Sequence, residues 1–333
     1  MRKVRIAHDR IGAIIVLLAA AAAMPVTAAS WLPGNFTNAY GTKGYFLFVP
    51  TSYNPAVPMP LVVAIHGCTQ DPSSFAGATG YNALAESQGF LILYPDQPAV
   101  ANPSKCWNVQ YPVNQARSTG EPSIIQGMVA QVRATFAVDN KRVYVTGFSS
   151  GGAMASILLA CHPDTYAAGA VNAGLMYQAS SSDAEQTLTL LNGSAQDPNA
   201  KGNAAYACGQ SQNVKRPLLV FHGTWDAVVN PFNGNQTIAQ FAQTNDRADD
   251  GLDNGSVTAA WTSQTRGQVA GAAGRAYHVN NFVAGGITLM REYRIYGMGH
   301  AWSGGNAAYA YTDATGPNAT SIQWTFFAAN PKP

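Results

Sequence analysis

The sequence predicts a three-layer α/β sandwich with a mostly parallel central sheet. The first observation behind this prediction is a series of short, continuous apolar runs, typical of strands that are covered on both faces. The second is that helix-like stretches separate these runs, and such alternation is typical of α/β domains. In a sheet of this kind we expect functional residues just after the carboxyl ends of the strands.

The expected elements follow in chain order. Strands are expected at residues 45–49, 61–65, 90–94, 143–146, 168–171, 218–221 and 291–296. Helices are expected at residues 73–86, 122–136 and 152–161. The Asp-rich segment 245–255 departs from the EF-hand order of ligands and is interpreted as a solvated loop. Residues 261–283 are rich in Gly and Ala and receive no assignment.

The amino terminus has the organisation of a secretory signal peptide. Arg2, Lys3 and Arg5 precede an apolar run at 11–24, and small residues follow at 26–28. The run is too short and too Ala-rich for a convincing membrane span. We therefore expect residues 1–29 to be a signal peptide, and the mature protein to be secreted and not bound to a membrane. Residues 30–333 show no linker or repeat and are expected to form one domain.

Charge and cysteine content narrow the possible partners. Only 11% of residues are charged and the net charge is +2, so no electrostatic argument favours nucleic acid or an anionic membrane. Four cysteines in an exported chain favour two disulfides. They allow three connectivities. No Cys-x-x-Cys or Cys/His spacing indicates a metal site.

A G-x-S-x-G sequence at residues 147–151 carries the strongest chemical signal, with Ser149 at its centre. It follows the expected strand 143–146 and leads into the expected helix 152–161. A nucleophile elbow needs this context, because a tight strand-to-helix turn lifts the serine hydroxyl above the sheet. The sequence therefore predicts Ser149 as a nucleophile in an α/β-hydrolase fold.

Two further residues complete a candidate triad in the expected chain order of Ser, acid and His. Asp226 lies in the loop after strand 218–221, and the Gly-flanked His300 follows strand 291–296. Both lie after the carboxyl end of an expected strand, where functional residues are expected in such a sheet. His300 would accept the proton of Ser149, and Asp226 would hold the imidazole in the correct tautomer. The acyl-enzyme chemistry that this predicts requires no metal and no organic cofactor.

Other candidate residues fit less well. His66 and His222 each precede a glycine at a strand end and are interpreted as structural. His162 is placed at the far end of the helix after the elbow. Asp96 precedes Ser149, so the chain order disfavours it. His278 stays open as a weaker alternative base.

Acyl transfer also needs hydrogen-bond donors for the oxyanion. One is the backbone N–H of the residue after the nucleophile, here Ser150. The second usually comes from the loop after an early strand, and His66-Gly67-Cys68 follows strand 61–65. We therefore expect the backbone N–H of Cys68 to be the second donor.

Taken together, these motifs resemble those of the secreted poly(3-hydroxybutyrate) depolymerase esterase family, whose relatives include feruloyl and acetylxylan esterases. The resemblance covers residues 44–327. It rests on the segments 60–70, 94–97, 106–108, 120–125, 147–154, 299–305, 311–313 and 316–317. The family implies the same triad and the same oxyanion donors.

The resemblance also implies disulfides and substrate contacts. It implies a Cys68–Cys106 bridge that fixes the oxyanion loop, which leaves Cys161–Cys208 as the second bridge. Trp107 and Trp302 fall in family motifs and are expected to line the acyl groove. Trp225, beside the acid, is a lesser candidate for substrate binding.

Three functions follow as hypotheses. The first is hydrolysis of poly(3-hydroxybutyrate) or its oligomers, and the second is a feruloyl or acetylxylan esterase acting on plant cell-wall polysaccharide. The third, from another class, is a non-catalytic secreted binding protein on a hydrolase fold. Polymer-degrading members often carry a substrate-binding domain after the catalytic one. The chain ends at Pro333, so we expect no separate substrate-binding domain, and we expect a monomer.

Overall fold

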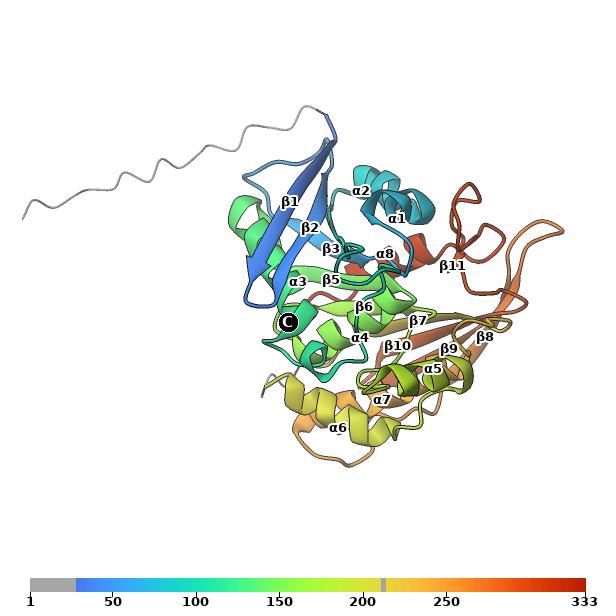
Figure 1. Ribbon diagram of the computed structural model, residues 1–333. Coiled ribbons are helices and arrows are strands. Elements are labelled where there is room, and N and C mark those ends of the chain that lie inside the picture. Colours follow the sequence, from blue (N-terminus) through green and yellow to red (C-terminus); the bar gives the residue numbers. More distant parts are fainter. Residues whose placement is uncertain (1–27, 211–213) are drawn as a thin grey trace, which may run out of the picture.

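A ten-stranded mixed sheet organises the protein, whose computed structural model describes residues 28–210 and 214–333 (Figure 1). The strand order is β1-β2-β4-β3-β5-β6-β7-β10-β9-β8. The strands are β1 (Ser30–Asn38), β2 (Gly41–Val49), β3 (Met59–Ile65), β4 (Leu91–Pro95), β5 (Val138–Phe148), β6 (Ala168–Asn172), β7 (Leu218–Gly223), β8 (Ser263–Gln268), β9 (Ala276–Ala284) and β10 (Ile287–Ile295). Residues 1–27 of the predicted signal peptide 1–29 lie outside the described residues.

The centre of the sheet is parallel and its flanks are antiparallel. Strands β4, β3, β5, β6, β7 and β10 pair in parallel, so their carboxyl ends meet at one edge. The hairpin β1–β2 and the hairpin β8–β9 extend opposite sides of the sheet (Figure 1). A small second sheet pairs β11 (Trp302–Ser303) with β12 (Thr312–Asp313).

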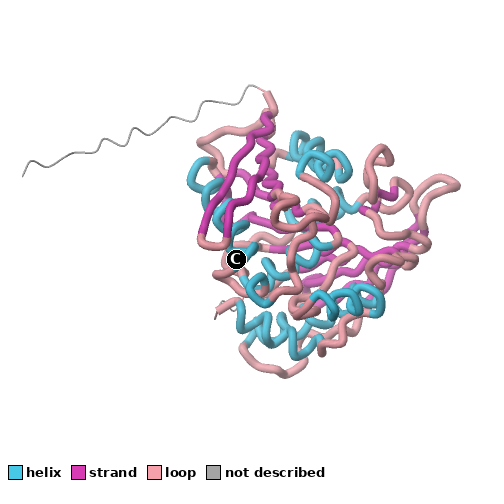
Figure 2. The backbone as a smooth tube through the Cα atoms, in the orientation of Figure 1, coloured by secondary structure: helices cyan, strands magenta, loops and turns pink. Residues whose placement is uncertain are grey.

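Helices cover both faces and produce the three layers (Figure 2). The helices are α1 (Pro72–Thr79), α2 (Tyr81–Gln88), α3 (Gly120–Thr135), α4 (Ser150–Cys161), α5 (Asp183–Asn192), α6 (Pro198–Cys208), α7 (Phe232–Asp250) and α8 (Ala319–Ala328), with a short 3₁₀ turn at Pro112–Asn114. Alternate strand residues face opposite layers. Val63 belongs to the core cluster that contains residues of α3, α4 and α7, whereas Val62 belongs to the cluster that contains residues of α1, α2 and α8. Both faces of the sheet are buried, which explains why the apolar runs of the strands are continuous.

The predicted α/β-hydrolase fold is confirmed, with local differences. The expected helix 73–86 is two helices, because Gly80 adopts a left-handed conformation (φ 69°) that ends α1 and precedes α2. The unassigned segment 261–283 forms β8 and most of β9. The amino-terminal strand β1 was not predicted, since its sequence SWLPGNFTN lacks a clear alternating pattern.

The prediction of a solvated loop at 245–255 is wrong for its first half. Helix α7 continues to Asp250, and Asp246 is almost fully buried. Its carboxylate accepts backbone N–H groups from Asn254, Gly255 and Val257 at 3.1–3.2 Å. This aspartate therefore folds the chain back against α7, a local hydrogen-bonding role that composition could not reveal.

No helix within residues 28–210 and 214–333 combines the length and apolar character needed to cross a bilayer. The second disulfide expected from the resemblance, Cys161–Cys208, is present and joins the ends of α4 and α6. It anchors the elbow helix α4 at the end opposite Ser149.

Candidate active site

Ser149 occupies a strained turn between β5 and α4. Its backbone has φ 55° and ψ −120°, a region that costs a non-glycine residue on the order of 1–3 kcal/mol. The flanking glycines allow this turn. A Cβ on Gly147 would lie 2.1 Å from the Gly151 carbonyl oxygen, and one on Gly151 would lie 2.2 Å from that of Ile65. The sequence pattern is therefore required by the close approach of β3, β5 and α4.

His300 and Asp226 form the hydrogen-bonded pair that the sequence predicts. The His300 Nδ1 lies 2.8 Å from Asp226 Oδ2, although the residues are separated by 74 positions. They come from the loops after the parallel neighbours β10 and β7. The other carboxylate oxygen, Oδ1, accepts the backbone N–H groups of Val228 and Val229 at 2.9 and 2.8 Å. The carboxylate is therefore fixed on both oxygens.

His222, interpreted from sequence as structural, packs directly against this carboxylate. Its Nε2 lies 2.9 Å from the Val229 carbonyl oxygen and 3.4 Å from Asp226 Oδ2. Its Nδ1 is buried and has no hydrogen-bond partner among the described residues. We assign the proton to Nε2, because a buried Nδ1–H would be an unpaired donor. His222 can therefore donate to the same carboxylate oxygen that His300 contacts.

These contacts set the charge of Asp226. Burial would raise the pKa of the carboxyl, but hydrogen bonds from His222 and His300, with the His300 charge, hold that pKa well below its usual range. The carboxylate therefore stays ionised at neutral pH. It can thus keep the hydrogen of His300 on Nδ1 and leave Nε2 free to act as a base.

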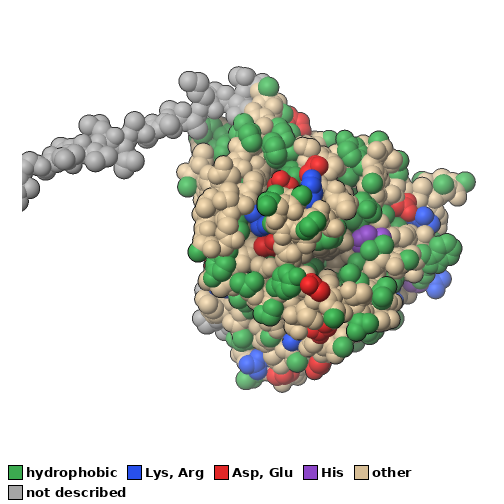
Figure 3. All heavy atoms as spheres, viewed as in Figure 1, with side chains coloured by type: hydrophobic (Ala, Val, Ile, Leu, Met, Phe, Trp, Pro, Cys, Tyr) green, Lys and Arg blue, Asp and Glu red, His purple; other side chains and the backbone are tan. Residues whose placement is uncertain are grey.

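Ser149 and His300 open onto one cavity of about 400 Å³. Its walls are Cys68, Asn102, Ser104, Cys106, Trp107, Gln110, Phe148, Ser149, Ser150, Leu175, Gln186, Leu190, Val228, Val229, His300 and Tyr311. A hollow with histidine at its edge is visible on this face of the molecule (Figure 3). The volume lies within the range of roughly 300–1,000 Å³ common for small-molecule sites.

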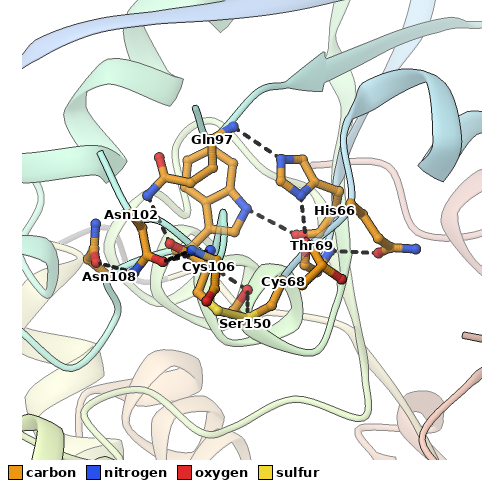
Figure 4. Close-up of a disulfide and its surroundings, with 12 residues drawn as sticks. His66, Cys68, Thr69, Gln97, Asn102, Cys106, Asn108 and Ser150 are labelled. Carbon is orange, nitrogen blue, oxygen red and sulfur yellow. Dashed lines mark hydrogen bonds between the residues drawn. A yellow bond between two sulfur atoms is a disulfide. The ribbon is translucent and has the colours of Figure 1, made fainter. Parts of the chain in front are cut away.

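A disulfide fixes the loop that carries the expected oxyanion donor. Cys68 is bonded to Cys106, the pairing implied by the resemblance (Figure 4). The Ser150 Oγ lies 3.4 Å from Cys68 Sγ and accepts the Trp107 backbone N–H at 3.3 Å. Neither the Cys68 nor the Ser150 backbone N–H donates to another group within the described part of the chain. Both donors are thus available at the cavity wall.

A buried polar network supports this loop from behind. Gln97 donates its backbone N–H to His66 Nε2 (3.1 Å) and its side-chain amide to the Cys106 carbonyl (2.9 Å) and Glu121 (2.7 Å). Lys43 lies 3.2 Å from Glu121, so the buried carboxylate is paired. The cysteine loop is therefore connected to β2, β4 and α3, as Figure 4 shows for His66 and Gln97.

The three predicted tryptophans have different environments. Trp107 lines the cavity, and its indole Nε1 donates to the His66 carbonyl at 3.0 Å. Trp302 does not line it, and the prediction of a groove contact is wrong. Its ring is 1% exposed, packs against Phe75 and Tyr81, and fills the α1–α2 side of the core. Trp225 is 74% exposed and lies outside the cavity wall.

Sequence reasoning missed most of the aliphatic wall. Leu190 comes from α5, and Val228 and Val229 come from the loop after β7. Only Val228 and Val229 had a sequence signal, because they directly follow the predicted acid. His278, the alternative base, does not line the cavity and instead contacts Tyr296 at 2.9 Å. The geometry therefore favours His300 over His278.

Comparison with known proteins agrees with this architecture. A family profile described as Esterase PHB depolymerase matches residues 43–269. The chain belongs to this esterase family. It is 33% identical over 80% of its length to poly(3-hydroxyalkanoate) depolymerase C of Paucimonas lemoignei, and 32% identical over 60% to acetylxylan esterase A of Emericella nidulans. It spans 60% and 66% of the lengths of those two family relatives.

A solved structure resembles most of this fold. The acetyl xylan esterase from Aspergillus awamori aligns with 89% of this chain and 99% of its own, with a TM-score of 0.67 and 20% identity. At that identity the likeness establishes the α/β-hydrolase fold shared by the family.

His66 generates a prediction on the pH dependence of stability. Its Nδ1 lies 2.7 Å from the Gly67 carbonyl, its Nε2 accepts from Gln97, and burial lowers its pKa from 6.5 to about 4. Asp96, 3.8 Å from Nε2, is the nearest acidic partner. As the pH falls, the His66 imidazole therefore gains its proton at a higher pH in the unfolded state than in the folded state. The stabilisation is complete above pH 6.5 and falls by on the order of 3 kcal/mol as the pH drops to about 4.

Urea unfolding midpoints measured across this pH window test the expectation. His66→Gln should be less stable than the wild type at neutral pH but should lose less further stability on acidification. His278→Gln, which changes a half-exposed imidazole, should keep the wild-type slope. Equal slopes in the His66 variant and the wild type would contradict the account.

Proposed function

We propose that this chain is a secreted serine esterase with Ser149 as nucleophile, His300 as base and Asp226 as the residue that orients the base. The proposal rests on one observation. Ser149, in its strained backbone conformation, and His300, hydrogen-bonded to Asp226, line the same cavity. A binding protein would have no need to keep the costly backbone conformation at Ser149. Family membership supports the same chemistry.

The mechanism follows from the positions of these groups. His300 Nε2 takes the proton as Ser149 Oγ attacks the ester carbonyl, and the N–H groups of Cys68 and Ser150 bind the oxyanion. The alcohol leaves with the proton from His300, and the acyl group stays on Ser149. Water then repeats the attack, with His300 as base again, and releases the acid. Removing one oxyanion donor is expected to cost about 2.7–4 kcal/mol of transition-state stabilisation.

For the substrate we propose an aliphatic 3-hydroxyalkanoate polyester or its oligomers. The cavity wall includes the aliphatic side chains of Leu175, Leu190 and Val229. Exposed apolar side chains continue from the same segments, namely Leu188, Leu191, Trp225, Val228 and Phe232. Such exposed apolar surface suits contact with a water-insoluble polymer. The similarity to the Paucimonas depolymerase over 80% of this chain supports this choice.

The second candidate is an esterase for acetyl or feruloyl groups on cell-wall polysaccharide. The observation in its favour is the near-complete alignment of the Aspergillus awamori acetyl xylan esterase with this fold. The two candidates differ in the alcohol and acyl groups, not in the catalytic residues. They must therefore be separated by substrate.

Clearing of an amorphous poly(3-hydroxybutyrate) suspension, with products identified by mass, tests the proposal. The wild type is expected to clear the suspension and release hydroxybutyrate oligomers. Ser149→Ala should lose at least about 10⁴-fold in rate, because the substitution removes the proposed nucleophile. Ser182→Ala, a helix-capping serine on α5, should keep activity within a few-fold and serves as the matched control.

The outcomes are distinct. Hydrolysis of acetylated xylan or methyl ferulate without clearing would replace the polyester by the polysaccharide ester and keep the triad. Equal activity of Ser149→Ala and wild type on p-nitrophenyl butyrate would contradict the triad itself.

His222 yields a second prediction, on the pH profile. His222→Leu removes the N–H that faces Asp226, so the pKa of that carboxyl should rise and the carboxylate becomes a stronger hydrogen-bond acceptor. It should then favour the protonated, inactive form of the base, and the acid-side loss of activity should begin at higher pH. We expect kcat/KM on p-nitrophenyl butyrate to fall about tenfold at neutral pH, or about 1.4 kcal/mol. His222→Gln, whose amide can still donate, should recover part of both effects. A profile unchanged in His222→Leu would show that this residue only fills space.

A further inference from the structure

A second cavity, of about 360 Å³, lies at the β8–β10 side of the sheet, away from β1 and β2 (Figure 1). The cavity is bounded by α7, by the loop that precedes β8, and by strands β8, β9 and β10. Its walls are Asn235, Ile238, Ala259, Trp261, Gln264, His278, Asn280, Phe282, Glu292, Arg294 and Tyr296. It shares no residue with the wall of the Ser149 cavity. We refer to it as the α7 pocket.

Planar polar side chains form a chain of contacts across the α7 pocket. Gln264 donates to Asn280 at 2.7 Å, and Asn280 donates to Glu292 at 2.8 Å. Arg294 lies 3.1 Å from the same Glu292 oxygen and donates to Asn235. Glu292 and Asn280 are almost fully buried, so these contacts fix their orientation.

This chain of contacts leaves both donors and acceptors unused. Among the described residues, the second carboxylate oxygen of Glu292 accepts no hydrogen bond, and the Gln264 amide oxygen accepts none. The Asn235 amide nitrogen and His278 Nε2 are likewise unused within the described chain. Glu292 and Arg294 neutralise each other, so the pocket selects neither an anion nor a cation. Its ligand should be neutral and rich in groups that both donate and accept.

Aromatic side chains stand at the rim of the α7 pocket. Trp261 is 55% exposed and Tyr296 is 43% exposed. The Tyr296 hydroxyl lies 2.9 Å from His278 Nδ1, with the two rings edge to face. An exposed indole offers a flat apolar surface to a ligand. Exposed apolar side chains that cluster at a pocket often mark a binding site.

We propose that the α7 pocket binds one or two sugar rings of a neutral polysaccharide. A pyranose has one apolar C–H face, which can stack on Trp261, and a rim of hydroxyls that both donate and accept. Those hydroxyls match the unused groups of Glu292 and Gln264. A polyester segment has no donor and would leave these acceptors unpaired in the bound state, which costs affinity. The proposal is independent of which ester is cleaved at Ser149.

Two residues of the α7 pocket belong to chain segments close in sequence to the proposed catalytic residues. Tyr296 precedes His300 by four residues in the loop after β10, and Asn235 lies in the first turn of α7, after the Asp226 loop. A saccharide chain held here would therefore raise the local concentration of attached or associated esters.

Fluorine NMR of the protein labelled with 5-fluorotryptophan tests the proposal, because the chain has only six tryptophans. Trp261→Phe and Trp107→Phe assign the resonances of the two cavities. Titration with xylohexaose, cellohexaose and maltohexaose should produce a saturable shift of the Trp261 resonance with at least one probe. The Trp107 resonance reports separately on any binding in the Ser149 cavity. A soluble trimer of 3-hydroxybutyrate should leave Trp261 unchanged.

Matched variants locate the binding. Gln264→Ala should weaken the apparent Kd at least about threefold through loss of one hydrogen-bonding side chain. Gln268→Ala, an exposed glutamine on the same strand but outside the pocket, should match the wild type. No shift of Trp261 with any of the three oligosaccharides, a shift of Trp107 instead, or a Trp261 response to the hydroxybutyrate trimer would overturn the proposal.

Discussion

The candidate site depends first on the close approach of α4 to the ends of β3 and β5. Backbone oxygens lie where a Cβ on Gly147 or Gly151 would have to sit, so these positions accept only glycine without displacement of the sheet or helix. That contact forces Ser149 into its left-handed turn. It also brings Ser150 beside the Cys68 loop, because Gly151 touches the backbone of Ile65 and His66. The nucleophile and the expected oxyanion donors are thus placed by one packing constraint.

The remaining parts of the site are held by buried polar contacts that are nearly all satisfied. Asp226 is held by His222, His300, Val228 and Val229, and the cysteine loop is held by Gln97. Such networks are rigid when their members are paired. Another part of the cavity wall is supplied by α5 and the loop after β7, and apart from Gln186 it is aliphatic. The polar support thus lies behind the proposed catalytic groups, whereas the mostly apolar wall is left to contact substrate.

The sequence was sufficient for features that follow from local pattern and chain order. Continuous apolar runs located the parallel strands, and G-x-S-x-G in its strand-to-helix context located the elbow. Trp302 was misplaced because a motif does not reveal which side of the sheet a ring faces, and here it faces the core. The buried role of Asp246 was missed because its partners, the N–H groups of residues 254–257, carry no side-chain signal. The α7 pocket could not be predicted from the sequence for a related reason. It is assembled from α7, β8, β9 and β10, whose contacts are long-range and whose segment 261–283 has no clear periodicity.

The rate at which a fluorophosphonate labels the protein tests the central claim most directly, with the modified peptide identified by mass. The account predicts a single adduct on Ser149 in the wild type. It also predicts labelling slowed by at least about 10³-fold in His300→Gln, since Ser149 then lacks its general base, and labelling close to wild type in His278→Gln. No adduct on Ser149, or equal labelling rates in His300→Gln and the wild type, would contradict the assignment of a serine nucleophile activated by His300.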